Sequence, residues 1–134
     1  MTKSVTKWIK EIISTKEAPP AVGPYSQAVG AGPLLFVSGQ LGLVPGSKDF
    51  LGSTADLQTR QAMENLAAVL EAGGSSLDLI VKTTIYLKDI GDFPAVNEVY
   101  GSFFEGDPPA RETVQVAGMP LNGLVQISVV ALRD

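Results

Sequence analysis

The stretch LDLIVKTTIYLKDI, residues 77–90, decides the fold class of this chain. Five of the eight side chains from Ile80 to Leu87 are β-branched, and a sixth is a tyrosine. Such side chains pack well on a pleated surface and lose rotamer freedom in a helix. We therefore predict a central β-strand here, and the rest of the fold is built outward from it.

Helical patterns lie on both sides of this strand. Residues 55–72 contain no proline or glycine, and their apolar side chains recur close to helical spacing. Thr54 has the side chain of an N-cap, and the sequence GGSS at 73–76 is a stop signal. A second helix is predicted over 93–104, with Asp92 as its cap.

Further strands are predicted towards both ends of the chain. Residues 23–43 hold two apolar segments around a Gly-Ala-Gly-Pro turn and predict a β-hairpin. A short β-prone segment precedes them, beginning at Glu11. Residues 111–119 and 123–132 predict two more strands, joined by the turn sequence PLNG. The order is β-β-α-β-α-β-β, which predicts an α+β fold with an antiparallel-rich sheet and both helices on one face.

The length of 134 residues fits one domain, residues 1–134, with residues 1–11 as an N-terminal extension. Two helices on one face leave the other face of the sheet uncovered. The last strand, 123–132, is nonetheless mostly apolar at both alternate positions, which is typical of burial on both faces. We therefore predict that copies of the chain associate into a closed ring through this open face.

Composition excludes several kinds of chemistry. The chain has no histidine and no cysteine, so disulfides, thiolate nucleophiles, imidazole bases and Cys/His metal sites are impossible, and its acidic residues are too scattered for a carboxylate metal site. The net charge of −4 argues against nucleic-acid binding, and no apolar stretch approaches a membrane span. The N-terminus lacks the apolar core of a secretory signal, and we expect a cytoplasmic protein.

Polar residues interrupt the apolar pattern at a few places. Arg111, after the turn GDPPA, carries a planar fork of donors suited to a carboxylate, although arginines at strand ends also pair with surface acids. Tyr25 follows a Gly-Pro turn, where its phenol could line a pocket or be partly buried at the rim of the sheet.

Three further positions need an explanation. Ser38 and Gly39 end a very apolar strand, where the glycine lets another group approach the backbone closely, or where the strand simply exits into a loop. Gln126 is an amide inside an apolar strand and must pair with the backbone or face a polar pocket. Asn97 and Tyr100 lie three residues apart on one helix face, where Asn97 caps a neighbouring loop or serves a site.

Several separated motifs together resemble the RidA/YjgF family of enamine/imine deaminases. They cover residues 12–132 and are APPAVGPYSQAV (18–29), LLFVSGQLGL (34–43), QTRQAMENLAAVLEAGG (58–74), IVKTTIYLKDIGDFPAVNEVYGSFF (80–104), PPARETVQVAGMP (108–120) and LVQISVVAL (124–132). The resemblance implies a chorismate-mutase-like (bacillus type) fold assembled as a homotrimer with clefts between subunits. It also implies hydrolysis of 2-aminoacrylate or 2-aminocrotonate to 2-oxo acids and ammonia, with no metal or cofactor.

The resemblance also assigns roles to residues of this chain. Arg111 matches the arginine that holds the substrate carboxylate, and Tyr25 matches a pocket tyrosine. Ser38 and Gly39 match the pocket's serine-glycine pair, and Asn97 matches a helix asparagine of the cleft.

Two positions depart from the family pattern. Gln126 replaces a glutamate proposed to orient or activate the attacking water; an amide can position water but cannot accept its proton. Thr113 replaces a frequent cysteine two residues after the arginine. Glu112 is a poor substitute for the missing acid, because alternation directs it to the opposite face of the strand from Arg111.

Three functional hypotheses follow. The first is an imine deaminase of reduced activity, in which Arg111, Gln126 and Tyr25 act on the substrate and Ser38, Gly39, Asn97 and Thr113 help to bind it. The second is a non-catalytic trimer that binds 2-oxo acids or similar carboxylates. The third, a translation inhibitor or endoribonuclease, is the weakest because the chain is acidic and lacks a histidine acid/base pair.

Overall fold

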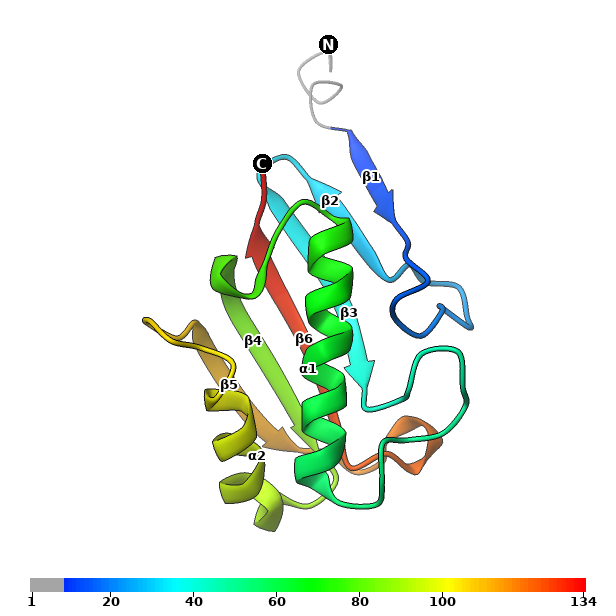
Figure 1. Cartoon of the computed structure of the whole chain (residues 1–134), viewed down its shortest axis with the longest axis vertical. Helices are drawn as coiled ribbons and strands as arrows, with labels where there is room; N and C mark the ends of the chain where they lie inside the picture. Colours follow the sequence, from blue (N-terminus) through cyan, green and yellow to red (C-terminus); the bar gives the residue numbers. More distant parts are fainter. Residues whose placement is uncertain (1–8) are drawn as a thin grey trace.

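A single six-stranded sheet with both helices packed on one face makes up the computed structural model, which describes residues 9–134 (Figure 1). The strands are β1 Lys10–Ile13, β2 Ala28–Ala31, β3 Leu34–Leu41, β4 Ile80–Leu87, β5 Ala110–Gln115 and β6 Val125–Leu132. The helices are α1 Ala55–Ala72 and α2 Phe93–Gly101. Across the sheet the strand order is β1-β2-β3-β6-β4-β5, and every neighbouring pair is antiparallel except β4 and β5.

The α+β class and the predicted order of elements are confirmed. The order β-β-α-β-α-β-β describes the chain from β2 to β6, and β1, the short β-prone segment, precedes it. β1 begins at Lys10 and so takes the last two residues of the predicted N-terminal extension into the sheet. Residues 1–8 of that extension lie outside the described residues.

The hairpin of β2 and β3 and the helix α1 form where the sequence predicts them. Gly32, in the turn between the two strands, has a φ of 58°, a conformation that glycine adopts without steric cost. α1 spans residues 55–72 as predicted, and its last turn is closed by the Ser75 amide, which donates to the Leu70 carbonyl at 2.8 Å. Thr54 is the N-cap residue, but its hydroxyl makes no capping hydrogen bond to the backbone. It hydrogen-bonds the Asp56 carboxylate instead, which lowers the pKa of Asp56.

α2 begins at Phe93, with Asp92 at its N-cap position, as predicted. Asp92 nonetheless has helical backbone angles, and its side chain makes no capping hydrogen bond. A 3₁₀ turn, Ile90–Asp92, precedes the helix, and the cap of this turn is Asp89, whose carboxylate accepts a hydrogen bond from the Gly91 amide at 2.8 Å. The helix ends at Gly101, three residues before the predicted end at 104.

The two C-terminal strands are connected in sequence but are not neighbours in the sheet. β4 lies between β5 and β6, so the turn PLNG carries the chain past the end of β4 and does not form a hairpin. Leu121 and Asn122 in this turn have φ values of 55° and 60°. β5 ends at Gln115, earlier than the predicted strand, because the chain must leave the sheet edge to make this crossing.

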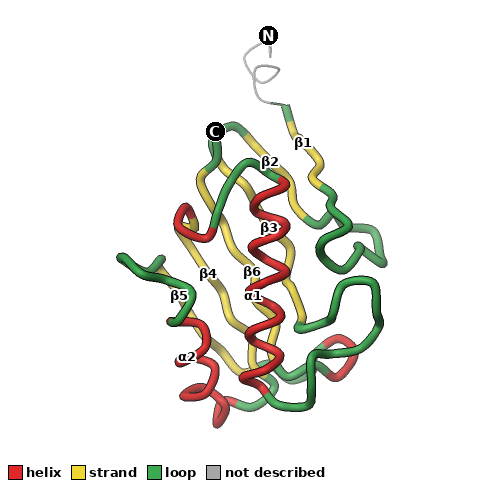
Figure 2. The backbone as a smooth tube through the Cα atoms, viewed as in Figure 1, coloured by secondary structure: helices red, strands yellow, loops and turns green. Residues whose placement is uncertain are grey.

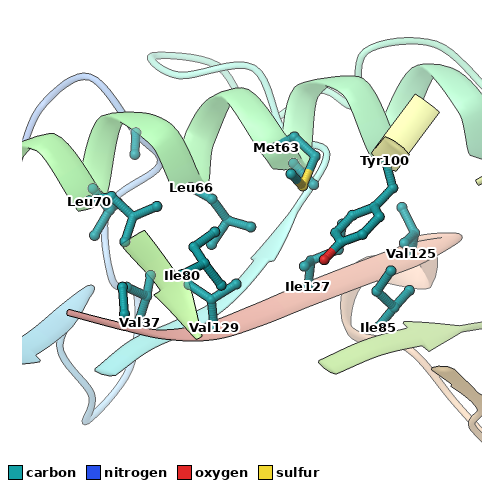
Figure 3. Close-up of a cluster of buried hydrophobic side chains, with 14 of the residues drawn as sticks. Val37, Met63, Leu66, Leu70, Ile80, Ile85, Tyr100, Val125, Ile127 and Val129 are labelled. Atoms are coloured by element: carbon teal, nitrogen blue, oxygen red, sulfur yellow. The ribbon is translucent and has the colours of Figure 1, made fainter. Parts of the chain in front are cut away.

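The hydrophobic core lies between α1, α2 and the helix-facing side of the sheet (Figure 3). Met63, Leu66 and Leu70 of α1 are completely buried, and so is Ile127 of β6. In β6 only alternate residues are buried: Val125, Ile127, Val129 and Ala131. The remaining β6 side chains lie on the other face, which none of the helices and strands within residues 9–134 covers (Figure 1). The described part of one chain therefore buries only one face of this strand.

That open face is apolar across much of its width. One row of paired residues crosses the sheet on this side, and we call it the open-face row: Ile12, Val29, Phe36, Val130, Lys82 and Ala110. Ile12, on the edge strand β1, is 56% exposed, and Phe36, on the inner strand β3, is 45% exposed, which is a large exposure for an apolar side chain of an inner strand. Within residues 9–134, no helix has the length and apolar character needed to cross a bilayer.

Packing of α1 on the sheet should dominate the stability of the fold. Leu66 is 0% exposed, so Leu66→Ala should lower the free energy of unfolding by about 2–5 kcal/mol, from lost burial and the cavity left behind. Leu57→Ala makes the same change on the same helix at a side chain that is 41% exposed, and it should stay within about 0.5 kcal/mol of wild type. Urea unfolding at equal protein concentration compares the two; equal losses would contradict the described core.

Candidate functional site

Arg111 is the last member of a row that is otherwise buried. The residues paired across the helix-facing side of the sheet at this level, the Arg111 row, are Ile13, Ala28, Val37, Val129, Thr83 and Arg111. The first five are at most 6% exposed, whereas Arg111 is partly buried on the edge strand β5, beside α2. Arg111 thus lies at the sheet-edge end of a row of buried side chains, and it is not a solvent-exposed arginine at the end of a strand.

Two aromatic rings hold the guanidinium of Arg111. Its Cζ lies 5.0 Å from the centroid of the Tyr100 ring and 5.6 Å from that of Phe93, both on α2. These are cation–π distances, and the attraction grows when the pair is shielded from water. Burial raises the pKa of Tyr100 above its ordinary value of 10.0, against the opposing effects of a hydrogen bond with Thr83 and of the nearby Arg111 charge. Tyr100 is therefore neutral at physiological pH and does not pair with the arginine as an anion.

Arg111 has no acidic partner among residues 9–134. The salt bridges in this part of the chain are Lys82–Glu112 and Arg133–Glu11. Glu112, the neighbour of Arg111 in sequence, points to the open face as predicted, where its carboxylate is 3.4 Å from the Lys82 amine. The charge of Arg111 and its N–H donors thus remain available to an anion from outside the chain.

A groove of about 670 Å³ opens beside Arg111. The connection from α2 to β5 projects beyond the sheet edge (Figure 2). Residues of this connection line one side of the groove. Asn97 and Tyr100 line the groove from α2, as their shared helix face predicts, and Phe104 and Pro109 line it from the connection. The Phe104 ring lies 4.9 Å from the Tyr100 ring. The groove therefore combines the Arg111 cation, the Asn97 amide and the Glu98 carboxylate with apolar walls, and Glu98 forms no salt bridge with Arg111. The guanidinium suits the anionic end of a small ligand.

Thr113 lies on the same face of β5 as Arg111, two residues further along. Its hydroxyl oxygen is buried and has no hydrogen-bond partner among the described residues. An unsatisfied buried hydroxyl costs free energy unless another molecule supplies the partner. Of the predicted site residues, Arg111, Asn97 and Thr113 thus lie together on the helix side of the sheet.

Tyr25 and Ser38 lie elsewhere in the chain. Tyr25 is 52% exposed, and its hydroxyl oxygen accepts a long hydrogen bond of 3.4 Å from the Val22 amide. The Ser38 hydroxyl donates to the Ser26 carbonyl at 2.6 Å and its amide donates to the Gln27 carbonyl, so both of its donors serve the fold. The two residues lie in adjoining hollows that share Ser26.

Gly39 and Gln126 are brought together on the open face. The register of β3 against β6 shifts between Val37 and Gln40, so Gly39 lies in an irregularity where the two strands are not paired. A Cβ atom at Gly39 would come within 2.7 Å of Gln126 Cδ. The close approach expected at this glycine is therefore made by the Gln126 side chain.

The predicted site residues form two groups on opposite sides of the sheet. Arg111 pairs in register with Thr83, whose side chain faces the helices, whereas Gln126 pairs with Tyr86, whose side chain faces away from them. Side chains on opposite faces of one sheet cannot meet at one small ligand. A site that uses both groups must take each group from a different copy of the chain.

Sequence reasoning missed Phe93. Its position was predicted to lie in the second helix, but its contact with Arg111 was not anticipated. A signal was present: residues 93, 97 and 100 follow the i, i+4, i+7 spacing of one helix face. The sequence does not show which residues of β5 this helix face packs against.

Among residues 9–134, no group of three or more His, Cys, Asp or Glu side chains could hold a metal ion. The polar side chains that line the groove are the Asn97 amide, the Tyr100 phenol, the Arg111 guanidinium and a single carboxylate, that of Glu98.

Comparisons with known proteins bear on this arrangement. The family model described as Endoribonuclease L-PSP matches residues 15–133. The chain is 46% identical over 122 residues to Reactive Intermediate Deaminase A, chloroplastic, of Arabidopsis thaliana, covering 91% of this chain and 65% of that protein. It is 42% identical over 125 residues to the 2-iminobutanoate/2-iminopropanoate deaminase of Mus musculus, covering 93% of this chain and 91% of that protein.

A solved structure shows the same fold. The crystal structure of E. coli TdcF with bound serine superposes with a TM-score of 0.88 at 37% sequence identity, covering 92% of this chain and 99% of that one. Sequence and fold both match over nearly the whole chain, and together they assign the chain to one family. The chain belongs to the RidA/YjgF family.

Proposed function

We propose that this protein hydrolyses 2-imino acids, formed from 2-aminoacrylate and 2-aminocrotonate, to 2-oxo acids and ammonia. The single observation that carries the proposal is the Arg111 guanidinium, which ends a buried row, lies at a groove and has no acidic partner among residues 9–134. Holding an unpaired cation in partly buried surroundings costs free energy that a bound anion recovers. The Mus musculus relative, which is named as a 2-iminobutanoate/2-iminopropanoate deaminase, supports a carboxylate as that anion.

The substrate's chemistry fits the residues available. A protonated 2-imino acid has its carboxylate on the carbon next to the C=N bond, so Arg111 would fix the carboxylate and thereby place the electrophilic carbon. Serine, which E. coli TdcF binds, has the same arrangement of a carboxylate beside a nitrogen-bearing carbon. Water adds to that carbon and loses one proton, and the nitrogen takes up one proton. The C–N bond then breaks as the C=O bond forms, and the remaining hydroxyl proton passes to the departing ammonia or to solvent. The products are the 2-oxo acid and ammonia, which leaves as the ammonium ion.

Gln126 limits how the water is activated. Its amide can hold a water molecule by hydrogen bonds, and its side chain passes over Gly39 at the irregularity of β3. An amide has no useful basicity, so the water would lose its proton to solvent or to the product nitrogen. Because the protonated imine is already electrophilic, holding the water molecule in place without a strong base would allow hydrolysis at a reduced rate.

A complete site would need two copies of the chain. Arg111, Asn97 and Thr113 lie on the helix side at β5, whereas Gln126 and Gly39 lie on the open face. We propose a homotrimer in which the open faces cover one another and Arg111 of one copy faces the Gly39–Gln126 region of the next. The exposed apolar open-face row supports this arrangement, because its burial would stabilise the assembly.

We also propose a cytoplasmic location, whereas the related Arabidopsis protein is named as chloroplastic. The endoribonuclease reading matches the description of the family model, but a net charge of −4 and the lack of histidine argue against it.

Removal of Arg111 should abolish most of the activity. Arg111→Ala should lower kcat/KM for a 2-imino acid by about 2–5 kcal/mol of lost anion binding, roughly 30-fold to several-thousand-fold. The imine is generated by an amino-acid oxidase and trapped by semicarbazide, so that deaminase activity appears as a lower yield of trapped product. Arg60→Ala, an exposed arginine on α1, is the matched control and should behave as wild type. Equal rates for wild type and Arg111→Ala would refute the proposal.

Gln126→Glu separates a weak deaminase from a protein that only binds carboxylates. Restoring a base should raise the rate by about 10²–10⁴-fold, while the affinity for 2-oxobutanoate stays the same. Gln115→Glu adds the same charge at the end of β5, where Gln115 accepts a hydrogen bond from the Ile90 amide, and should not change the rate. A wild-type protein that binds 2-oxobutanoate but does not accelerate imine decay, beside an active Gln126→Glu variant, would favour the binding protein.

The assembly is tested by light scattering. We expect a mass three times that of the 14.0 kDa chain. Val130→Asp places a charge in the middle of the open-face row and should reduce the mass to that of a single chain. Leu57→Asp makes a similar change on α1, away from that face, and should leave the mass unchanged. A monomeric wild-type protein, or a Val130→Asp variant that remains trimeric, would contradict the arrangement.

A further inference from the structure

Tyr100 bridges two residues that are neighbours in the sheet. Its hydroxyl donates to the Thr83 hydroxyl oxygen at 2.9 Å, and the centroid of its ring lies 5.0 Å from Arg111 Cζ. Thr83 and Arg111 are register partners in the parallel pair β4–β5. One side chain of α2 is thus tied by its hydroxyl to a completely buried threonine and contacts with its ring the arginine beside that threonine.

The surroundings leave the Tyr100 ring little freedom. The residue is 4% exposed, and Figure 3 shows it pointing from its helix into the core cluster that includes Ile85 and Ile127. The Phe104 ring packs against it at a centroid distance of 4.9 Å, with the two planes tilted by 53°. A ring fixed at its hydroxyl and supported on its side makes a rigid platform for a neighbouring group.

An aromatic ring can hold Arg111 in place without neutralising its charge, whereas a carboxylate cannot. A carboxylate would hold the guanidinium in place, but it would also neutralise the charge and occupy its N–H donors. An aromatic face attracts the cation through its quadrupole, without a formal charge and without strong acceptor atoms. Tyr100 and Phe93 can therefore restrain Arg111 while its donors remain free for a ligand.

We propose that Tyr100 is a positioning residue, whose ring, anchored through Thr83, sets the position of the Arg111 guanidinium in the groove. Phe93 restrains the same guanidinium through a second, more distant ring contact. The consequence for activity rests on the function proposed above, but the restraint of the side chain does not. The two are therefore measured separately.

The restraint is measured by NMR on the full chain with ¹⁵N-labelled arginine. The chain has three arginines, Arg60, Arg111 and Arg133, so each Nε–H signal can be assigned by substitution. In the wild type, the Arg111 Nε–H order parameter should be close to a rigid value of about 0.85, and in Tyr100→Leu it should fall below about 0.6. Arg133, which is bonded to Glu11 and to the Gly32 carbonyl, is the internal control and should not change.

Two milder variants test the anchor and keep the inference testable if Tyr100→Leu does not fold. Tyr100→Phe keeps the ring and removes the hydroxyl, whereas Thr83→Val keeps both rings and removes the acceptor. Each should lower the order parameter of Arg111 by less than Tyr100→Leu does. An Arg111 signal that is as rigid in all folded variants as in the wild type would overturn the proposal.

The effect on catalysis is measured by a double-mutant cycle. Tyr100→Leu should raise KM for a 2-imino acid about 2- to 30-fold, the range expected for a cation–π contact, with a smaller change in kcat. In an Arg111→Met background, the same substitution should have little further effect, because Tyr100 acts through the arginine. An undiminished effect in that background would show a general structural role and overturn the proposal. A wild type without deaminase activity whose Arg111 still loosens in Tyr100→Leu would refute the proposed function and support the positioning role.

Discussion

The alternation of side chains along β5 is the constraint on which the candidate site depends. Successive residues of a strand point to opposite faces, so Arg111 enters the helix side and Glu112 enters the open side. The acid nearest in sequence is thereby kept away from the guanidinium and pairs with Lys82 across the open face. With side-chain exposures of 43% and 61%, that ion pair is solvated and contributes little to stability. Its importance lies in leaving the arginine unneutralised.

The edge position of β5 decides how much of the arginine is buried. On an inner strand of the Arg111 row, the guanidinium would lie among completely buried side chains such as Val129 and Thr83, where an unpaired charge is very costly. At the edge, it is partly buried, and α2 supplies two aromatic faces in place of a counter-ion. The groove beside it can then admit a ligand from solvent. The core and the site share Tyr100, which belongs to both.

The open face connects the fold to the site. Because helices cover only one side of the sheet, apolar residues such as Phe36 and Ile12 are exposed on the open face. In this chain the open face also carries Gln126 and Gly39. Covering the face with a second copy would bury the apolar row and place Gln126 in contact with that copy. In the proposed trimer, one association therefore both stabilises the sheet and completes the pocket.

Sequence reasoning located most of the elements because their signals are local. The β-branched strand β4, the glycine turn of the β2–β3 hairpin and the limits of α1 all follow from side-chain types over a few residues. Asp92 does occupy the N-cap position of α2, but the side chain that makes a capping hydrogen bond is that of Asp89, at the 3₁₀ turn before the helix, which the local pattern did not predict. Arg111, Asn97 and Tyr100 were recognised as polar or aromatic residues out of place in a core pattern. Their assembly into one groove was not predictable from spacing.

The sequence by itself determined the identity of the elements, the alternation that separates Arg111 from Glu112, and the absence of histidine and cysteine chemistry. These depend on covalent geometry and composition, which the order of residues specifies completely. Only the tertiary structure decided that β4 separates β5 from β6, that Phe93 and Tyr100 contact Arg111, and that Gln126 lies on the other face from it. The reason is that these relations join segments far apart in the chain. They are set by how strands order themselves and how a helix packs across them, which no local pattern records.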